Sequence, residues 1–172
     1  MKLMKLLALT IAVLLLAGGC GTGAAVGKGA DRNVVGELTQ KALDEHQMIV
    51  EVKFINPVGA SAFPSFDGYR MKISGGKVKA YLPYFGRSYT PIIAGVDESG
   101  IVFDDCEIEI REDYSKSSKG KYFWKFSAES GNEKVDVVIS FMNDGSAQIS
   151  CNSVNRSPIT YRGELIPEES EQ

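Results

Sequence analysis

The sequence predicts a mainly β fold: an antiparallel meander of about eight strands, forming a barrel or sandwich with one N-terminal helix packed on it. Three observations lead to this prediction. Apolar residues alternate with polar ones over most of the chain after residue 48, as in half-buried strands. Short turns that contain glycine or asparagine separate successive alternating segments, as in β-hairpins. Only the segment 31–45 repeats its apolar residues at helical spacing.

The predicted helix precedes the first strand. Asp31 is a candidate N-cap, because its side chain can accept a hydrogen bond from the first turn. Gly36 lies inside the segment and weakens its helical propensity. The apolar residues that carry the helical spacing are Val34, Val35, Leu38, Ala42 and Leu43.

The first hairpin follows from the register of two alternating segments. A two-residue turn at Gly75-Gly76 places Ile73 opposite Val78 and, two residues further, other apolar pairs on the same face. A slip of one residue would turn every apolar side chain outward, so we expect this register.

Two more hairpins follow near the C-terminus. A turn at 131–132 places Glu129 opposite Lys134, which is a favourable cross-strand pair. The turn at 143–145 keeps the apolar residues on one face only as a three-residue loop, so we expect Gly145 in a left-handed conformation.

The remaining segments are less regular. The strand-like residues 101–103 and 106–110 differ in phase, which predicts a bulge at Asp104-Asp105. Residues 59–68 are expected to form a loop with buried aromatic side chains. A last strand is expected near 159–166, and residues 167–172 are expected to be a disordered tail.

The N-terminus is typical of an export signal. Lys2 and Lys5 precede an apolar run from Leu6 to Leu16, which is shorter than the about 20 residues that span a bilayer. Ala17-Gly18-Gly19-Cys20 follows and resembles the lipobox of bacterial lipoproteins, although Ala17 stands where a larger aliphatic residue is usual. We therefore expect residues 1–19 to be a signal peptide and Cys20 to carry the lipid.

This assignment fixes the expected domain organisation. Residues 20–30, small and rich in glycine, are expected to be a flexible tether, followed by a single β-rich domain over residues 31–166. The membrane is then a partner through the lipid anchor. Gly21 after the cysteine, by resemblance to lipoprotein sorting rules, favours an outer-membrane anchor that faces the periplasm, with surface display as the alternative.

Composition limits the classes of partner. The formal net charge is −3, and removal of Lys2 and Lys5 makes it −5. A mildly acidic domain does not have the charge of a nucleic-acid binder, nor a broad polybasic surface for anionic lipid. No metal- or nucleotide-binding motif is present, so the sequence predicts no cofactor and no metal.

No catalytic residue is predicted. His46 is the single histidine, and its polar neighbours indicate a solvated surface residue rather than a catalytic base. The acidic segment 104–113 could form a calcium site or the carboxylate pair of a glycosidase. However, Glu107 and Glu109 alternate with apolar residues, which favours the interpretation that they lie on a solvated strand face beside lysines. The acidic residues of this segment are Asp104, Asp105, Glu107, Glu109, Glu112 and Asp113.

Two cysteines fall in the predicted domain. Cys106 and Cys151 both lie on predicted inward faces, so both are expected to be buried. An oxidising compartment permits a disulfide between them, and two free buried thiols remain the alternative.

The run Tyr81-Leu82-Pro83-Tyr84-Phe85-Gly86-Arg87-Ser88-Tyr89 has the most distinctive composition in the chain. It admits two interpretations. Its aromatic side chains close one end of the sheet, or they form a recognition surface, because tyrosine and arginine are favoured in binding hot spots. The candidate contact residues are Tyr81, Tyr84, Phe85, Arg87 and Tyr89.

The same run, with the later Gly100-Ile101-Val102-Phe103, resembles an uncharacterised lipoprotein family of gut-type Bacteroidota that is known only as a domain of unknown function. The resemblance covers most of the chain after the signal peptide. It implies a lipid-anchored domain and supplies no catalytic residues.

These observations predict a lipid-anchored envelope protein. Its expected role is a non-enzymatic binding module for a protein, a glycan or an apolar ligand. Two alternatives remain open: an envelope polysaccharide hydrolase that uses carboxylates in 104–113, and a structural component of the envelope.

Overall fold

The computed structural model describes residues 28–89 and 100–168, with side chains from Val34 onward. The expected signal peptide, Cys20 and most of the expected tether lie outside these residues. The elements, in chain order, are α2 (Lys28–Glu45), β1 (Met48–Pro57), β2 (Phe63–Pro64), β3 (Arg70–Ser74), β4 (Lys77–Pro83), β5 (Gly100–Glu107), β6 (Arg111–Asp113), the 3₁₀ turn η1 (Ser117–Lys119), β7 (Lys121–Ser130), β8 (Glu133–Met142), β9 (Ser146–Ser153) and β10 (Ile159–Leu165).

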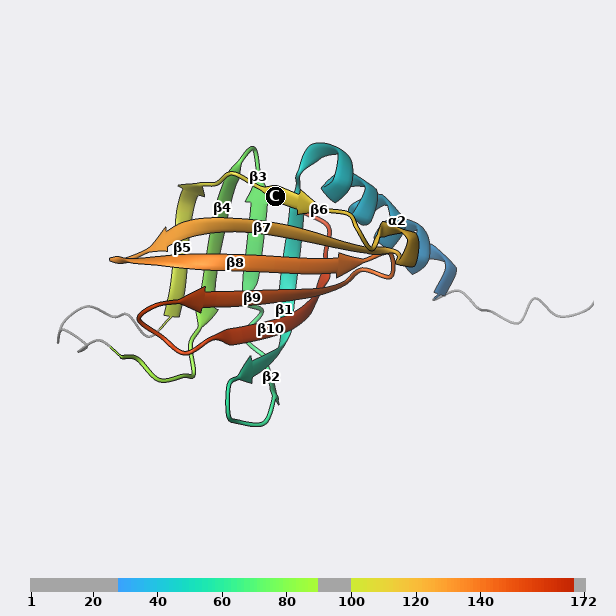
Figure 1. Cartoon of the computed structure of the whole chain (residues 1–172). Helices are drawn as coiled ribbons and strands as arrows, with labels where there is room; N and C mark the ends of the chain where they lie inside the picture. The colour runs from blue at the N-terminus through green and yellow to red at the C-terminus, as the bar shows by residue number, and fades with distance from the viewer. Residues whose placement is uncertain (1–27, 90–99, 169–172) are drawn as a thin grey trace, which may run out of the picture. The chain divides into compact units, whose positions relative to one another are not determined.

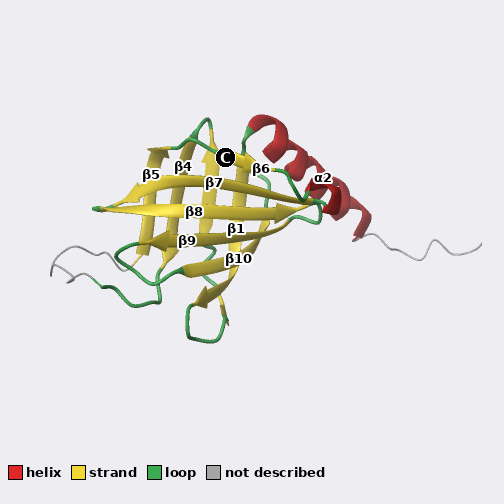
Figure 2. Ribbon diagram, in the orientation of Figure 1, coloured by secondary structure: helices red, strands yellow, loops and turns green. Residues whose placement is uncertain are grey.

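The strands form one curled antiparallel sheet, a half-barrel, with the helix at one end (Figure 1, Figure 2). The prediction of a mainly β fold is confirmed. Of the two architectures left open, barrel and sandwich, the structure is closer to the barrel, because its single sheet curls into a half-barrel. The order of the strands is β5-β4-β3-β1-β10-β9-β8-β7-β6, with β2 paired to β1. Two meanders are therefore joined by the pairing of β1 with β10, and β5 and β6, neighbours in sequence, lie at opposite edges.

The predicted registers are confirmed. Ile73 lies opposite Val78 across the first hairpin, and Glu129 lies opposite Lys134 across the turn at 131–132. The three-residue loop at 143–145 is present, and Gly145 has a φ of 79°. These registers place the apolar residues of each strand inside the curled sheet, where Trp124, Phe141, Phe103 and Tyr161 are the largest buried side chains.

Two bulges shape the sheet. The predicted bulge in β5 is present, because the pairing with β4 shifts between Val78 and Ala80 and Asp105 has a φ of 49°. A second bulge, which we did not predict, shifts the pairing of β1 with β10 between Val52 and Phe54. At this point Gly163 of β10 lies against the backbone of β1, so closely that an added Cβ would lie 1.9 Å from the carbonyl oxygen of Glu51.

The two ends of the chain differ from the prediction in detail. Helix α2 begins at Lys28, so residues 28–30 are helical rather than tether, and Asp31 lies within the helix instead of capping it. Ala42 is fully buried against the sheet, as the helical spacing predicts. At the other end, Glu168 of the expected tail forms an ion pair with Lys72 of β3, which extends the ordered chain two residues beyond the predicted domain.

Candidate functional site

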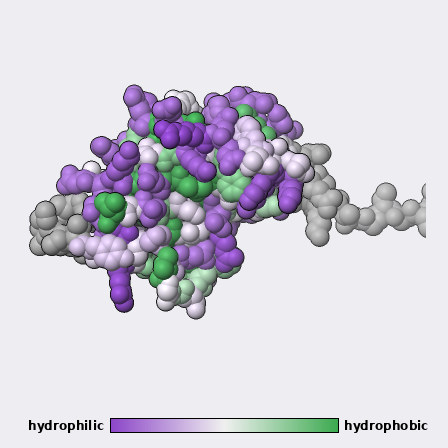
Figure 3. Space-filling model, viewed as in Figure 1, coloured by the Kyte–Doolittle hydropathy of each residue, from purple (hydrophilic) through white to green (hydrophobic). Residues whose placement is uncertain are grey.

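Apolar side chains gather on the surface at the end of the half-barrel where β2 lies (Figure 1, Figure 3). Three loops form this end, at residues 58–66, 84–89 and 153–157, and we call it the aromatic end. The prediction that the aromatic side chains of the loop 59–68 are buried is wrong, because Phe66 is 88% exposed and Phe63 is only half-buried. The other large apolar residues exposed in these loops are Val58, Phe85, Tyr89 and Val154.

The three loops are held together by specific contacts. The Phe63 and Phe85 rings meet edge to face, with their centroids 5.0 Å apart. The backbone N–H of Tyr89 donates to the carbonyl oxygen of Asn155 at 2.7 Å, and the N–H of Ser157 donates to that of Arg87 at 2.9 Å. The exposed apolar residues thus belong to one surface rather than to independent loops.

The structure places the predicted contact residues in different environments. Phe85, Arg87 and Tyr89 are exposed on the aromatic end. Tyr84 is half-buried, and Tyr81 lies on the outer face of β4, where its ring packs on Tyr69 at 6.0 Å. Within residues 28–89 and 100–168, the Arg87 guanidinium has no hydrogen bond or ion pair. The run therefore combines a structural part with an exposed part.

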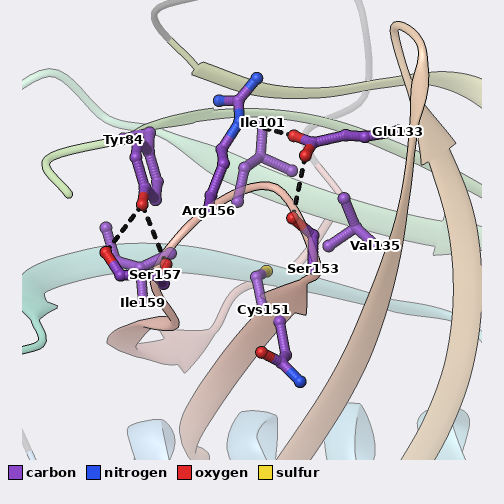
Figure 4. Close-up of a pocket in the computed structure, with 10 residues that line it drawn as sticks. Tyr84, Ile101, Glu133, Val135, Cys151, Ser153, Arg156, Ser157 and Ile159 are labelled. Carbon is purple, nitrogen blue, oxygen red and sulfur yellow. Dashed lines mark hydrogen bonds and ion pairs between the residues drawn. The ribbon is translucent and has the colours of Figure 1, made fainter. Parts of the chain in front are cut away.

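A buried ion pair fixes the loops from beneath (Figure 4). Nε of Arg156 lies 2.6 Å from Oε1 of Glu133, and the two side chains are only 10% and 6% exposed. Ser153 Oγ donates to the other Glu133 oxygen at 2.9 Å, and Arg156 Nη1 donates to the carbonyl oxygen of Gly100 at 3.0 Å. The pair therefore joins β8, the 153–157 loop and the start of β5.

Tyr84 connects this pair to the aromatic end. The Arg156 guanidinium lies over the Tyr84 ring, 5.2 Å from its centroid, in a cation–π contact. The Tyr84 hydroxyl lies 2.9 Å from the carbonyl oxygens of Arg87 and Ser157. Sequence analysis identified Tyr84 but missed Glu133 and Arg156, because two isolated charges twenty-three positions apart in sequence give no pattern.

The space between these groups is too small for a ligand. The pocket lined by Tyr84, Glu133, Cys151 and Arg156 has a volume of about 10 Å³ (Figure 4). That volume accommodates about one water molecule. The polar cluster therefore supports the loops above it.

The carboxylates of the 104–113 segment do not converge on one point. Asp104 and Asp105 lie at the β5 bulge, each within 4 Å of Nζ of Lys79, at 3.7 and 3.8 Å. Glu107 lies opposite Lys77, which is the arrangement expected of an acidic strand beside lysines. Among the described residues, no three His, Cys, Asp or Glu side chains are placed to hold a metal ion.

Glu112 lies apart from these carboxylates, beside the end of α2. Its Oε1 accepts a hydrogen bond from the Tyr114 hydroxyl at 2.6 Å and contacts Nε2 of His46. The Tyr114 hydrogen bond, and to a smaller degree His46, lowers the pKa of Glu112, while burial and then Glu112 raise the pKa of Tyr114 to about 12. His46 is thus not freely solvated: it packs on Trp124, 5.6 Å between ring centroids, and joins the helix end to β6.

Comparison with known protein families decides the identity of the fold. The family model described as "Domain of unknown function (DUF4251)" matches residues 36–165. The chain belongs to this family. The match includes all three loops of the aromatic end and both residues of the buried ion pair.

A solved structure resembles this DUF4251 domain. It is the crystal structure of a DUF4251 family protein from Bacteroides eggerthii, with a TM-score of 0.55 and 15% sequence identity over 80% of this chain and 88% of that chain. At this identity the likeness concerns the fold alone. No curated protein matches the sequence, and no helix among the described residues of the DUF4251 chain is long and apolar enough to cross a membrane.

Both cysteines of the DUF4251 domain are free thiols. The sequence left open a disulfide between Cys106 and Cys151 or two free thiols, and the structure has the two free thiols. The two residues are on different parts of the sheet, because Cys106 lies beside β4 whereas Cys151 lies between β8 and β10. Cys151 is buried as predicted. Cys106 lies opposite the buried Val78 but is only half-buried, because β5 is the edge strand of the sheet; its Sγ donates to the carbonyl oxygen of Glu129 at 3.5 Å.

We expect the two thiols to differ strongly in reactivity. Burial raises the pKa of Cys151 to about 12, so this thiol has almost no thiolate at neutral pH. Treatment of the native protein with iodoacetamide should therefore label Cys106 and leave Cys151 unlabelled until denaturant is added, as mass spectrometry of the peptides will show. Labelling of Cys151 at the rate of Cys106 without denaturant would contradict the packing described here.

Proposed function

We propose that this DUF4251 protein is a lipid-anchored module of the cell envelope that binds a partner protein through the aromatic end and catalyses no reaction. The anchor is Cys20, in an outer membrane, and the domain faces the periplasm. The observation that carries the binding proposal is the set of exposed Phe, Tyr and Val side chains on three adjoining loops, of which the loops 84–89 and 153–157 contact a buried ion pair.

The shape and chemistry of this surface favour a protein partner over a small ligand. Its side chains project from loops, and the pocket beneath them has room for about one water molecule. Aromatic residues and arginine are enriched in protein-binding hot spots, and Arg87 has no ion pair within the part of the chain that the structure describes. Arg87 can form a two-point contact with a carboxylate of the partner.

The anchor is tested by replacing Cys20. In cells fed radioactive palmitate, the wild-type chain should be labelled and recovered in the membrane fraction, whereas Cys20→Ala should lose the label and leave that fraction. Cys106→Ala is the matched control and should keep both properties. A labelled, membrane-bound Cys20→Ala protein would contradict the proposed anchor.

The binding surface is tested first by stability. Phe85 is 51% exposed, so Phe85→Ala should lower the free energy of unfolding by less than about 1 kcal/mol. Phe103, 1% exposed in β5, is the matched control, and Phe103→Ala should cost about 3–5 kcal/mol. Both values come from chemical denaturation. Equal large losses in the two variants would mean that Phe85 serves the architecture of the domain, and the binding proposal would lose its support.

A further inference from the structure

A second surface of the domain carries a concentration of positive charge that the overall composition conceals. It lies on the outer face of β6 and β7 and on the loop that joins them. We call it the basic face. Its cations are Arg111, Lys116, Lys119, Lys121 and Lys125, although the formal charge of the whole chain is −3.

The strand registers explain how the charges come together. Side chains alternate along β7, so the inward-pointing Trp124 and Phe126 leave Phe123 and Lys125 pointing outward. Arg111 of β6 lies opposite Lys125 and so joins the same outer face. Glu112, the neighbour of Arg111, faces the other way and contacts His46. The fold thus sorts the mixed charges of residues 111–125 onto two faces.

Little negative charge remains on the basic face. Among the described residues, Asp113 and Glu129 are the acidic residues of β6 and β7 that lie on it. Asp113 Oδ2 lies 3.8 Å from Nζ of Lys125, and Glu129, near the far end of β7, lies opposite Lys134 of β8. Asp136 lies further along β8, where the Ser127 hydroxyl donates to it. Asp144, in the turn after β8, accepts from the backbone N–H and the hydroxyl of Ser146.

Apolar side chains lie between the cations. Lys116 and Lys121 both extend over the Phe123 ring, with Nζ 5.5 and 5.1 Å from its centroid. Met142, 36% exposed, lies opposite Lys121 on β8, and Val138 lies opposite Lys125. Figure 3 views this side of the molecule and shows hydrophobic residues surrounded by hydrophilic ones over β7 and β8.

The basic face adjoins the end from which the chain leads to Cys20. The backbone N–H of Asn143 donates to the carbonyl oxygen of Gly120 at 3.1 Å, so the turn after β8 lies beside the lysine loop. The same turn contacts α2, because Gly145 lies against Val35. Val35 is fifteen positions after Cys20, and even a fully extended connection of that length spans only about 50 Å.

We propose that the basic face docks on the anionic headgroups of the phospholipid bilayer that holds the lipid anchor. Lysines around partly exposed apolar side chains are the chemistry that anionic bilayer surfaces attract. Each lysine close to such a surface changes binding about fivefold. This inference rests on the proposed anchor at Cys20. It leaves the aromatic end free for a protein partner.

The test uses the lipidated chain in vesicles of phosphatidylcholine alone or with 30% phosphatidylglycerol. Lysines are acetylated with an N-hydroxysuccinimide ester, and mass spectrometry gives the rate at each residue. In the anionic vesicles at low salt, Lys116 and Lys119 should react at least about threefold more slowly, and 0.5 M salt should restore their rates. Lys79, which points outward from β4 rather than from β6 or β7, is the control and should be unchanged.

The same experiment separates this inference from the proposed anchor. Flotation with pure phosphatidylcholine vesicles reports the anchor. If the chain floats and Lys116 and Lys119 react equally in both vesicles, the basic face does not dock. If the chain does not float with phosphatidylcholine vesicles, the proposed anchor is wrong. In that case, flotation of the wild-type chain with the anionic vesicles that is abolished by the double substitution Lys116→Glu/Lys119→Glu would still support docking of the basic face. Absence of flotation with the anionic vesicles would overturn the inference.

Discussion

Replacing Glu133 with alanine should lower the free energy of unfolding by about 3–5 kcal/mol, because it leaves the Arg156 guanidinium buried without its counter-charge. The loss should also loosen the aromatic end, since Arg156 holds the carbonyl oxygen of Gly100 and packs on Tyr84. Denaturant unfolding gives the free energy. Amide hydrogen exchange of Tyr89 and Ser157, whose N–H groups join the loops, gives the local effect.

Two controls isolate the ion pair. Lys134→Ala, at the next position of β8, removes an exposed cross-strand partner of Glu129 and should cost less than about 1 kcal/mol. The double variant Glu133→Leu/Arg156→Met removes both buried charges and should recover most of the loss. If Glu133→Ala costs no more than Lys134→Ala, the pair does not hold the loops.

Replacing Gly163 with alanine should cost about 3 kcal/mol or more, at the upper end of the cost of overpacking. The added Cβ would lie 1.9 Å from the carbonyl oxygen of Glu51 and 3.2 Å from Cα of Val52. Both atoms belong to the backbone of β1, so no side chain can move aside. The pairing of β1 with β10 joins the two meanders, and forcing these strands apart should weaken the whole sheet.

Gly36 provides the matched control, because the same substitution there should have the opposite sign. Gly36 lies within α2 with no atom within 4 Å of an added Cβ. Gly36→Ala should therefore stabilise the protein by about 0.5–1 kcal/mol through helix propensity. Thermal or denaturant unfolding of both variants decides the matter. A Gly163→Ala protein as stable as the wild type would mean that β1 and β10 do not approach as described.

Local features of the fold could be predicted from the sequence. Turn residues and alternation fix hairpin registers, so the pairs Ile73 with Val78 and Glu129 with Lys134 followed directly. The β5 bulge followed from a conflict of phase between Phe103 and Cys106. The pairing of β1 with β10 could not be predicted, because no short turn joins those strands and periodicity within a strand does not name its neighbour.

The candidate site could be predicted only in part. The composition of residues 81–89 left two interpretations open, closure of one end of the sheet or a recognition surface. In the structure Tyr84 is half-buried, whereas Phe85, Arg87 and Tyr89 are exposed on the aromatic end. Its other members, Phe66 and Val154, come from distant loops that only the tertiary fold brings near. Burial depends on the same folding, which is why the sequence predicted buried aromatic side chains in the loop 59–68, where Phe66 is exposed.

The most direct test of the proposed binding module is site-specific photo-crosslinking in the cell envelope of the native organism. A photoreactive phenylalanine replaces Phe66 or Phe85, which lie on the aromatic end, or Asn132, which lies exposed in the turn between β7 and β8. We predict one discrete adduct with the same envelope protein from positions 66 and 85, lost when Arg87→Glu is added, and none from position 132. Absence of any adduct at positions 66 and 85, or the same adducts from all three positions, would contradict recognition by the aromatic end.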